Sequence, residues 1–255
     1  MSSLLRYRPS DRLYFIGLTF IRPRHVFLLL LLVSVVLSAL MLAGCSSSSG
    51  VMPNIYLMHM GYNGGIVYQT SGSSVVNSDI SLTLGNIVGQ SALELRIGYF
   101  AMCMRSSSSD SWLCNQNAST LAAQLSSSDD PLNLIHAADS FRSKIVFPYL
   151  LLIAAALSFI VFILILPFPP LLKSASTALC FLACILVLVS VLWQHTSSVA
   201  AGVLAVNVGN GTVFAGVGVT AMIMGWLSFG MLTVTVIGIY YFVVINQMVV
   251  TKIEG

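Results

Sequence analysis

Four long apolar stretches alternate along the chain with more polar connections. Each stretch is long enough for a helix to cross about 30 Å of hydrocarbon, which takes roughly 20 residues. A helix satisfies its backbone hydrogen bonds internally, so four membrane-spanning helices are the simplest prediction. The predicted spans are residues 25–44, 146–166, 174–193 and 216–245, and no internal repeat relates them.

Small side chains recur at four-residue spacing inside these stretches, a pattern that permits close contact between membrane helices. The predicted packing positions are Ser34, Ser38, Ala154, Ser158, Ser176, Cys180, Cys184, Ala221 and Gly225. Cys180 and Cys184 would also suit a metal ion bound from one helix face, although buried small residues are the commoner explanation. The four stretches hold no Asp, Glu, Lys or Arg, and such residues usually mark ion paths. The pattern therefore favours a regulator or scaffold over a channel.

The connection at residues 45–145 has the pattern of a small folded module. Aromatic and β-branched runs, or alternation of apolar and polar residues, predict strands there. These strands are expected at 54–62, 65–70, 78–86 and 93–103, with Asn63-Gly64-Gly65 as the turn between the first two.

Two helices are expected between these strands and the second span. Residues 117–125 predict a short helix, and a second helix starts with Asp130 as its N-cap and Pro131 in its first turn. The fold class that follows is a four-helix transmembrane bundle carrying a small antiparallel sheet.

Composition agrees with a membrane protein and excludes two other classes. Hydrophobic residues make up 57% of the 255 residues and charged residues only 7%, with a mean hydropathy of +0.92. Soluble domains carry about 25% charged residues, so most of this chain cannot face water. The net charge of +3 is too small and too dispersed for a nucleic-acid-binding surface.

Basic residues before the first span predict the orientation of the chain. Five arginines stand against the single acid Asp11 in this segment, namely Arg6, Arg8, Arg12, Arg22 and Arg24. By the positive-inside rule the N-terminus is then cytosolic. Four crossings place residues 1–24, 167–173 and 246–255 in the cytosol, and residues 45–145 and 194–215 outside the cell.

Two glycosylation sequons agree with this orientation. One begins at Asn117 and the other at Asn210, and each falls in one of the two predicted extracellular loops. Sequons are short and arise by chance, so neither alone would carry the orientation.

Two cysteines in the long outer loop are expected to form a disulfide. Cys103 and Cys114 would face an oxidising space, where pairs of thiols become bridges. Their spacing suits a hairpin in which a serine-rich turn reverses the chain. A structural staple is expected rather than a redox switch, because no CxxC spacing or flanking basic cluster lowers a thiol pKa.

The stretch from Leu42 to Ser49, LAGCSSSS, offers an alternative interpretation of Cys45. It resembles a bacterial lipobox, in which Cys45 would carry the lipid of a lipoprotein. The preceding segment is long for a signal peptide, and three further spans fit a lipoprotein poorly. The favoured interpretation is that Cys45 ends a helix at the lipid boundary, with residues 46–50 as a flexible exit.

The sequence contains no recognisable catalytic constellation. Its four histidines are scattered, and no G-x-S-x-G, H-E-x-x-H or phosphate-binding glycine loop occurs. His195 is expected at the membrane interface. Asp129 and Asp130 are adjacent acids, but no calcium-binding D-x-D-x-D-G loop is present. The protein is expected not to be an enzyme and to hold no cofactor or metal.

One short motif and its surroundings resemble a known family. Gly98, Tyr99, Phe100 and Cys103, followed by Trp112 and Cys114 in the first outer loop of a tetraspan chain, resemble claudin-type architecture. More narrowly, the chain resembles the fungal tetraspan family of calcium-influx regulators and membrane-fusion proteins induced during mating. The segments IYLMHMGYN, LRIGYFAMC…WLC and DPLNLI…FPYLLLIA are similar to landmarks of that family. The chain departs from it at Ala101, where the family usually has a second glycine.

The resemblance implies a plasma-membrane protein that aids calcium entry and cell fusion during mating or polarised growth. The expected partners are membrane lipids, calcium-channel or cell-fusion proteins and a second copy of the chain. A claudin-like adhesion or membrane-organising scaffold without a calcium role is the alternative.

Overall fold

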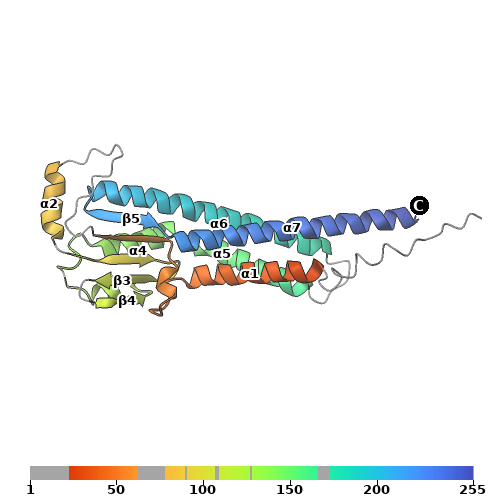
Figure 1. The fold of residues 1–255 in the computed structure, drawn as a ribbon, viewed down its shortest axis with the longest axis horizontal. Coiled ribbons are helices and arrows are strands. Elements are labelled where there is room, and N and C mark those ends of the chain that lie inside the picture. The colour runs from red at the N-terminus through yellow and green to blue at the C-terminus, as the bar shows by residue number, and fades with distance from the viewer. Residues whose placement is uncertain are drawn as a thin grey trace, which may run out of the picture.

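The computed structural model describes residues 23–62, 78–89, 91–106, 109–126, 128–165 and 173–254. Four long apolar helices run side by side along the longest axis of the molecule (Figure 1). They are α1 (Pro23–Ala43), α5 (Pro148–Ile165), α6 (Lys173–Val208) and α7 (Val219–Glu254). Helix α1 packs against α5 and α7, and α6 packs against the same two. The protein is therefore a multi-pass membrane protein with the predicted bundle.

A five-stranded antiparallel sheet stands at one end of this bundle (Figure 1). Its strands lie in the order β4-β3-β2-β1-β5. Their bounds are Met58–Tyr62 for β1, Glu94–Ile97 for β2, Met102–Ser106 for β3, Ser109–Asn115 for β4 and Val213–Val217 for β5. The long connection supplies the first four strands, and the connection between α6 and α7 supplies β5. The predicted fold class, a tetraspan bundle with a small disulfide-stapled sheet, is confirmed.

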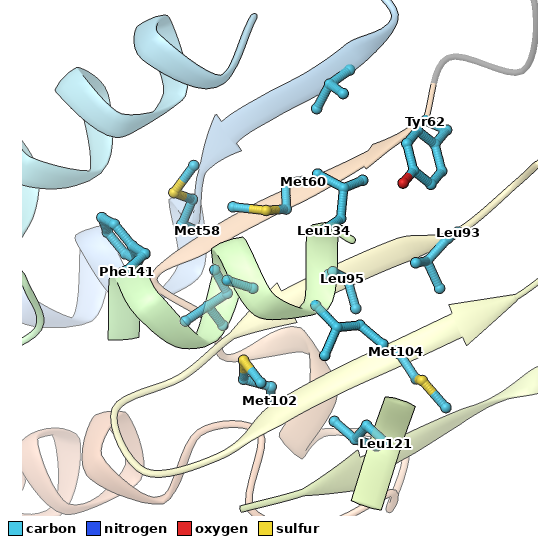
Figure 2. Close-up of a cluster of buried hydrophobic side chains, with 14 of the residues drawn as sticks. Met58, Met60, Tyr62, Leu93, Leu95, Met102, Met104, Leu121, Leu134 and Phe141 are labelled. Atoms are coloured by element: carbon cyan, nitrogen blue, oxygen red, sulfur yellow. The ribbon is translucent and has the colours of Figure 1, made fainter. Parts of the chain in front are cut away.

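One face of the sheet forms the core of what we call the sheet module, meaning the five strands with α2, α3 and α4. Helix α4 (Leu134–Ile145) lies across this face, and the short α3 (Ala118–Ala122) lies beside it (Figure 2). Alternate residues of β1, β2, β3 and β5 point into the core, as the two-residue period of a strand requires. The buried residues of these strands, with Leu93 just before β2, are Met58, Met60, Tyr62, Leu93, Leu95, Ile97, Met102, Met104 and Val213. Leu134, Ile135, Ala138 and Phe141 meet them from α4.

The sheet module and the bundle share buried residues at their junction. Leu57, just before β1, and Tyr99, between β2 and β3, belong to the same buried cluster as Leu31, Leu151 and Val187 of the helices. The module is thus packed onto the bundle rather than tethered to it.

The predicted strand at 78–86 is wrong, because this segment forms helix α2 (Ser78–Val88). Its apolar residues Ile80, Leu84 and Ile87 satisfy helical spacing as well as part of an alternating pattern. Periodicity alone therefore did not distinguish a helix from a strand. Gly89, at φ +55°, adopts a left-handed conformation that ends the helix, and its amide donates to the Gly85 carbonyl at 2.8 Å.

The predicted single strand at 93–103 is a hairpin instead. Strand β2 ends at Ile97, and the Gly98 amide donates to the Ala101 carbonyl at 2.9 Å, which reverses the chain into β3. A Cβ at Gly98 would meet the Gly44 carbonyl oxygen and, at 3.1 Å, the Cβ of Cys45, so only glycine fits this turn. Ala101 is fully buried there, which shows that the turn accepts a methyl group at that position.

The other predicted elements of the long connection agree more closely with the structure. The strand expected at 54–62 is present as β1, preceded by the single 3-10 turn η2 (Met52–Asn54). Helix α4 begins at Leu134 rather than beside Asp130, but the Asp130 carboxylate still accepts hydrogen bonds from the amides of Leu134 and Ile135, at 2.7 and 3.1 Å. The strand expected at 65–70 lies outside the described residues, as do 1–22 and 166–172.

Helix α6 is much longer than the predicted span at 174–193. Its 36 residues correspond to about 54 Å at 1.5 Å per residue, against about 30 Å of hydrocarbon. The loop predicted at 194–215 is therefore helical as far as Val208 and becomes strand β5 from Val213. Helix α7 starts at Val219, three residues after the predicted start of its span.

Candidate functional site

The face of the sheet opposite α4 carries polar and aromatic side chains, and we call it the charged face. Strand register sets one row of residues across all five strands: Gly216, His59, Arg96, Cys103 and Cys114. A second row pairs Glu94 with Arg105. Period-two alternation places these residues on one face because their neighbours Met60, Leu95 and Met104 fill the core.

Arg96 is the centre of the charged face. Its guanidinium lies 3.9 Å from the ring centroid of Trp112 and 4.8 Å from that of Tyr56. It also donates to the Pro53 carbonyl at 3.1 Å and to Asn54 Oδ1 at 2.7 Å. These contacts tie β2 to β4 and to the segment after α1, and they hold the cation in one orientation.

Glu94 joins the two arginines of the face. Its carboxylate accepts from Arg96 at 3.2 Å and from Arg105 at 2.8 Å. The Arg105 guanidinium also lies 4.9 Å from the Trp112 ring centroid, and its side chain is about half exposed. Among the described side chains of the face, these two cations meet one anion, and Arg105 is the more exposed of the two cations.

The disulfide between Cys103 and Cys114 closes the β3–β4 hairpin at directly opposite positions. It packs against Trp112 and the fully buried Cys45 and Ala101. No sequence argument linked Cys45 to this bridge, because their proximity depends on how α1 enters the sheet module.

Cys45 keeps a free thiol beneath the charged face. Its Sγ lies 3.7 Å from the carbonyl oxygens of both Ile55 and Arg96. Burial raises the pKa of this thiol to about 12, so it stays protonated and unreactive near neutral pH. A side chain with no exposed surface has no room for a lipid, and the lipobox interpretation does not fit this fold.

His59 occupies a pocket of aromatic rings at the edge of the same row. Its ring centroid lies 5.5 Å from that of Tyr56 and 5.9 Å from that of Phe214. Gly216 makes room for the imidazole, since a Cβ there would sit against the His59 ring. Burial lowers the pKa of His59, which keeps it neutral near pH 7. Among the described residues, its Nδ1 is the one buried side-chain nitrogen or oxygen without a hydrogen-bond partner.

The motif residues Tyr99 and Phe100 lie at the turn between β2 and β3. The buried Tyr99 hydroxyl donates to Gln194 Oε1 of α6 at 2.6 Å, and burial raises its pKa to about 12. Phe100 is exposed, while its carbonyl accepts from Arg142 of α4 at 3.1 Å. The turn therefore locks the sheet to both α6 and α4. Sequence reasoning did not identify Gln194, whose signal was a polar residue at the end of an apolar run.

A cluster of serine hydroxyls joins α1 to α7 inside the bundle. Ser34 and Ser38, both predicted packing positions, are buried, and their Oγ atoms lie 2.7 and 3.2 Å from Ser228 Oγ. Ser228 was not among the predicted positions, although it is a polar residue in an apolar stretch. Such interhelical hydrogen bonds contribute roughly 0.6–2 kcal/mol each in membranes.

The remaining predicted packing residues also face other helices. The buried ones are Ala154, Ser158, Ser176, Cys180, Cys184 and Ala221. A Cβ at Gly225 would lie 3.0 Å from Val191 and 3.3 Å from Met41. Cys184 Sγ lies 3.5 Å from Thr233 Oγ1. A metal site would need at least a third ligand beside Cys180 and Cys184. Among the described residues, no group of three His, Cys, Asp or Glu side chains could hold a metal ion.

The two sequons occupy different surroundings. Asn117 is exposed in the short link between β4 and α3. Asn210 lies in a left-handed turn after α6, and the Thr212 hydroxyl of its sequon is buried and donates to the Gly209 carbonyl at 2.6 Å. Occupancy of either site remains a prediction.

Comparison with models of protein families identifies a family match for most of the chain. The family model described as Ca2+ regulator and membrane fusion protein Fig1 matches residues 81–245. No curated protein matches the chain. The matched segment covers β2 to β5 with the arginines and the disulfide of the charged face, all of α5 and α6, and most of α7. Strand β1 with His59 precedes it. It is well over half of the chain. The protein therefore belongs to the Fig1 family of Ca2+ regulators and membrane fusion proteins.

Proposed function

We propose that the protein is a plasma-membrane regulator of calcium influx and of cell fusion during mating or polarised growth. The observation that carries this proposal is the family match over residues 81–245, which includes the sheet module's disulfide hairpin. The same segment contains the motif from Gly98 to Cys103 with Trp112 and Cys114.

The sheet module is proposed to lie outside the cell, with both termini in the cytosol. Five arginines before α1 support this orientation through the positive-inside rule. The disulfide of Cys103 and Cys114 supports it as well, because such bridges persist in oxidising compartments. The sequons at Asn117 and Asn210 lie on the same side of the bundle as this bridge.

Regulation is proposed to act through a partner rather than through conduction by this chain. The four apolar stretches contain no Asp, Glu, Lys or Arg to line an ion path. The charged face instead offers arginine and aromatic side chains held rigidly by stacking, which are the residue types that dominate binding at protein interfaces. We therefore propose this face, with Arg105 as its more exposed cation, as the contact for a calcium-channel or cell-fusion protein.

Calcium uptake in a strain lacking the gene tests the proposal. Wild-type protein should restore uptake, and Arg105→Ala should restore it incompletely at equal surface level. Lys144→Ala is the matched control, because Lys144 is an exposed cation on α4, across the core from the charged face. Equal rescue by both variants would remove the charged face from the proposal. Normal uptake in the deletion strain, with altered adhesion or membrane domains, would favour the scaffold alternative.

A further inference from the structure

A small cavity lies where the sheet module meets the bundle. The segment before β1 lines it with Leu57, and the turn between β2 and β3 lines it with Tyr99. Helix α6 contributes Ser190, Gln194 and Ser198, whose four-residue spacing places them on one face of the helix. All three are buried. The cavity thus gathers polar side chains at the level where the bundle gives way to the sheet module.

Gln194 presents unused hydrogen-bond donors to this cavity. The residue is only 6% exposed, and its Oε1 accepts from the Tyr99 hydroxyl at 2.6 Å. This is the one side-chain hydrogen bond of Gln194 to the described residues, so both N–H donors of its amide lack a partner there. Unlike His59 Nδ1, the amide nitrogen is not enclosed by protein atoms, because Gln194 lines the cavity. Buried donors are normally paired, so the cavity calls for an acceptor.

The size and charge of the cavity restrict what can enter it. Its volume of about 10 Å³ is room for one water-sized group. Among the described residues that line it, none is Asp, Glu, Lys or Arg. A phosphate or ammonium headgroup is therefore too large, and its charge would be buried without a partner. A hydroxyl is water-sized, and it can accept from the Gln194 amide while it donates to a neighbouring oxygen.

The cavity opens toward the lipid. Phe147 and Trp193 are the exposed members of its lining, at 51% and 49%, and their ring centroids lie 6.1 Å apart in an edge-to-face contact. Trp193 Nε1 donates to the Ile145 carbonyl at 3.0 Å, which holds the indole in place. The span of α5 begins at Pro148, so this opening stands at the boundary of the hydrocarbon, where aromatic side chains commonly lie.

We propose that the cavity binds the hydroxyl of a sterol. A sterol carries one hydroxyl at the end of a rigid apolar ring system, which matches a site for one uncharged polar group beside lipid. The exposed Val189 and Ile185 continue from Trp193 along α6 at four-residue spacing, and this apolar strip would contact the rings. Binding needs only a cavity at the boundary of the span, so it does not depend on the calcium role or on which side the sheet module faces.

Photo-crosslinking tests the proposal with full-length protein in sterol-free phosphatidylcholine nanodiscs. The probe is a photoreactive sterol that keeps its free hydroxyl, and mass spectrometry maps the labelled peptide. Labelling should fall on α6 around Trp193, and excess unlabelled sterol should suppress it. The acetate ester of the same sterol should compete poorly, because the ester is too large for the cavity and has no hydroxyl. Both competitors act on wild-type protein, so this comparison does not depend on the folding of a variant.

Gln194→Leu removes the amide and should reduce labelling about five- to tenfold, the loss expected for one hydrogen bond. Asn207→Leu is the matched control, because it removes an exposed amide from the same helix at a position outside the cavity. The control should label like the wild type.

Three results would overturn the proposal. Equal competition by the sterol and its acetate ester would reduce the labelling to apolar contact with the outside of the bundle. Equal labelling of the two variants would separate the probe from Gln194. Failure of the probe to label wild-type protein would leave a water molecule as the occupant of the cavity. Each of these results leaves the calcium-uptake test of the proposed function unaffected.

Discussion

At the scale of single residues, the sheet module is held together around Arg96 and the disulfide. Arg96 reaches Trp112, Tyr56, Pro53 and Asn54, so one guanidinium connects β2 with β4 and with the chain leaving α1. The bridge of Cys103 lies next to Arg96 in the same row. A stacked and hydrogen-bonded cation loses little further freedom on binding a partner, which suits a contact surface.

Removing the disulfide is expected to destabilise the sheet module. Cys103→Ser and Cys114→Ser should each lower the free energy of unfolding by about 3 kcal/mol, because a short closed loop regains entropy when the chain unfolds. The double variant should be no worse than either single variant, since one bond is lost in every case. Thermal unfolding of purified protein measures the loss, and alkylation with mass spectrometry of unreduced protein detects the bridge.

Cys45→Ser is the control for these variants. Its hydroxyl can donate to the carbonyls of Ile55 and Arg96 that the thiol already faces, so a smaller loss is expected. Free thiols at both Cys103 and Cys114 in mature surface protein would contradict the staple.

At the scale of elements, the bundle depends on close approach of α7 to α6 and α1. Gly225 lies where Val191 of α6 and Met41 of α1 meet α7, with no space for a larger side chain. Ser228, which bonds to Ser34 and Ser38 of α1, lies about one turn further along α7. Small residues at this contact let the helix backbones approach closely. The serine hydroxyls then form hydrogen bonds with one another.

Gly225→Leu is expected to force these helices apart. Overpacking of this kind costs about 1–3 kcal/mol, and thermal unfolding in detergent should register it. Gly230→Leu is the matched control on the same helix, because a Cβ there meets no atom within 4 Å. If both variants unfold at the wild-type temperature, the contact at Gly225 does not restrain the bundle.

At the scale of the whole molecule, a long axis runs from the bundle through the sheet module to α2 (Figure 1). The same axis puts the disulfide and both sequons on one side of the bilayer. A single determination of orientation therefore decides where all of these features act.

Glycosylation reports that orientation. Enzymatic deglycosylation of the cellular protein should shift its band on a gel, and Asn117→Gln should remove most of the shift because Asn117 is exposed. Asn210→Gln should change the band less, since the Thr212 hydroxyl of its sequon is buried and already bonded. A wild-type band that does not move would oppose an extracellular sheet module.

Features that depend on local pattern could be predicted from the sequence. Four apolar stretches specify four helices, because a helix of about 20 residues satisfies its own backbone in lipid, whereas the strands of a closed barrel span it in about ten. Cys103 and Cys114 pair because a short hairpin brings neighbouring residues together. Cys45 lies beside this bridge only because α1 delivers it there, and no spacing in the sequence indicates that.

Features that depend on contacts between distant segments were decided by the tertiary structure. Residues 78–86 satisfy two periodicities, and they form helix α2, which pairs with none of the described strands. Strand β5 exists because β1, more than a hundred residues earlier, offers an open edge to the chain leaving α6. The sequence by itself therefore determined which segments lie in lipid and which hairpin is bridged. Only the folded chain decided where the remaining apolar surface was buried and where, at α2, it stayed exposed.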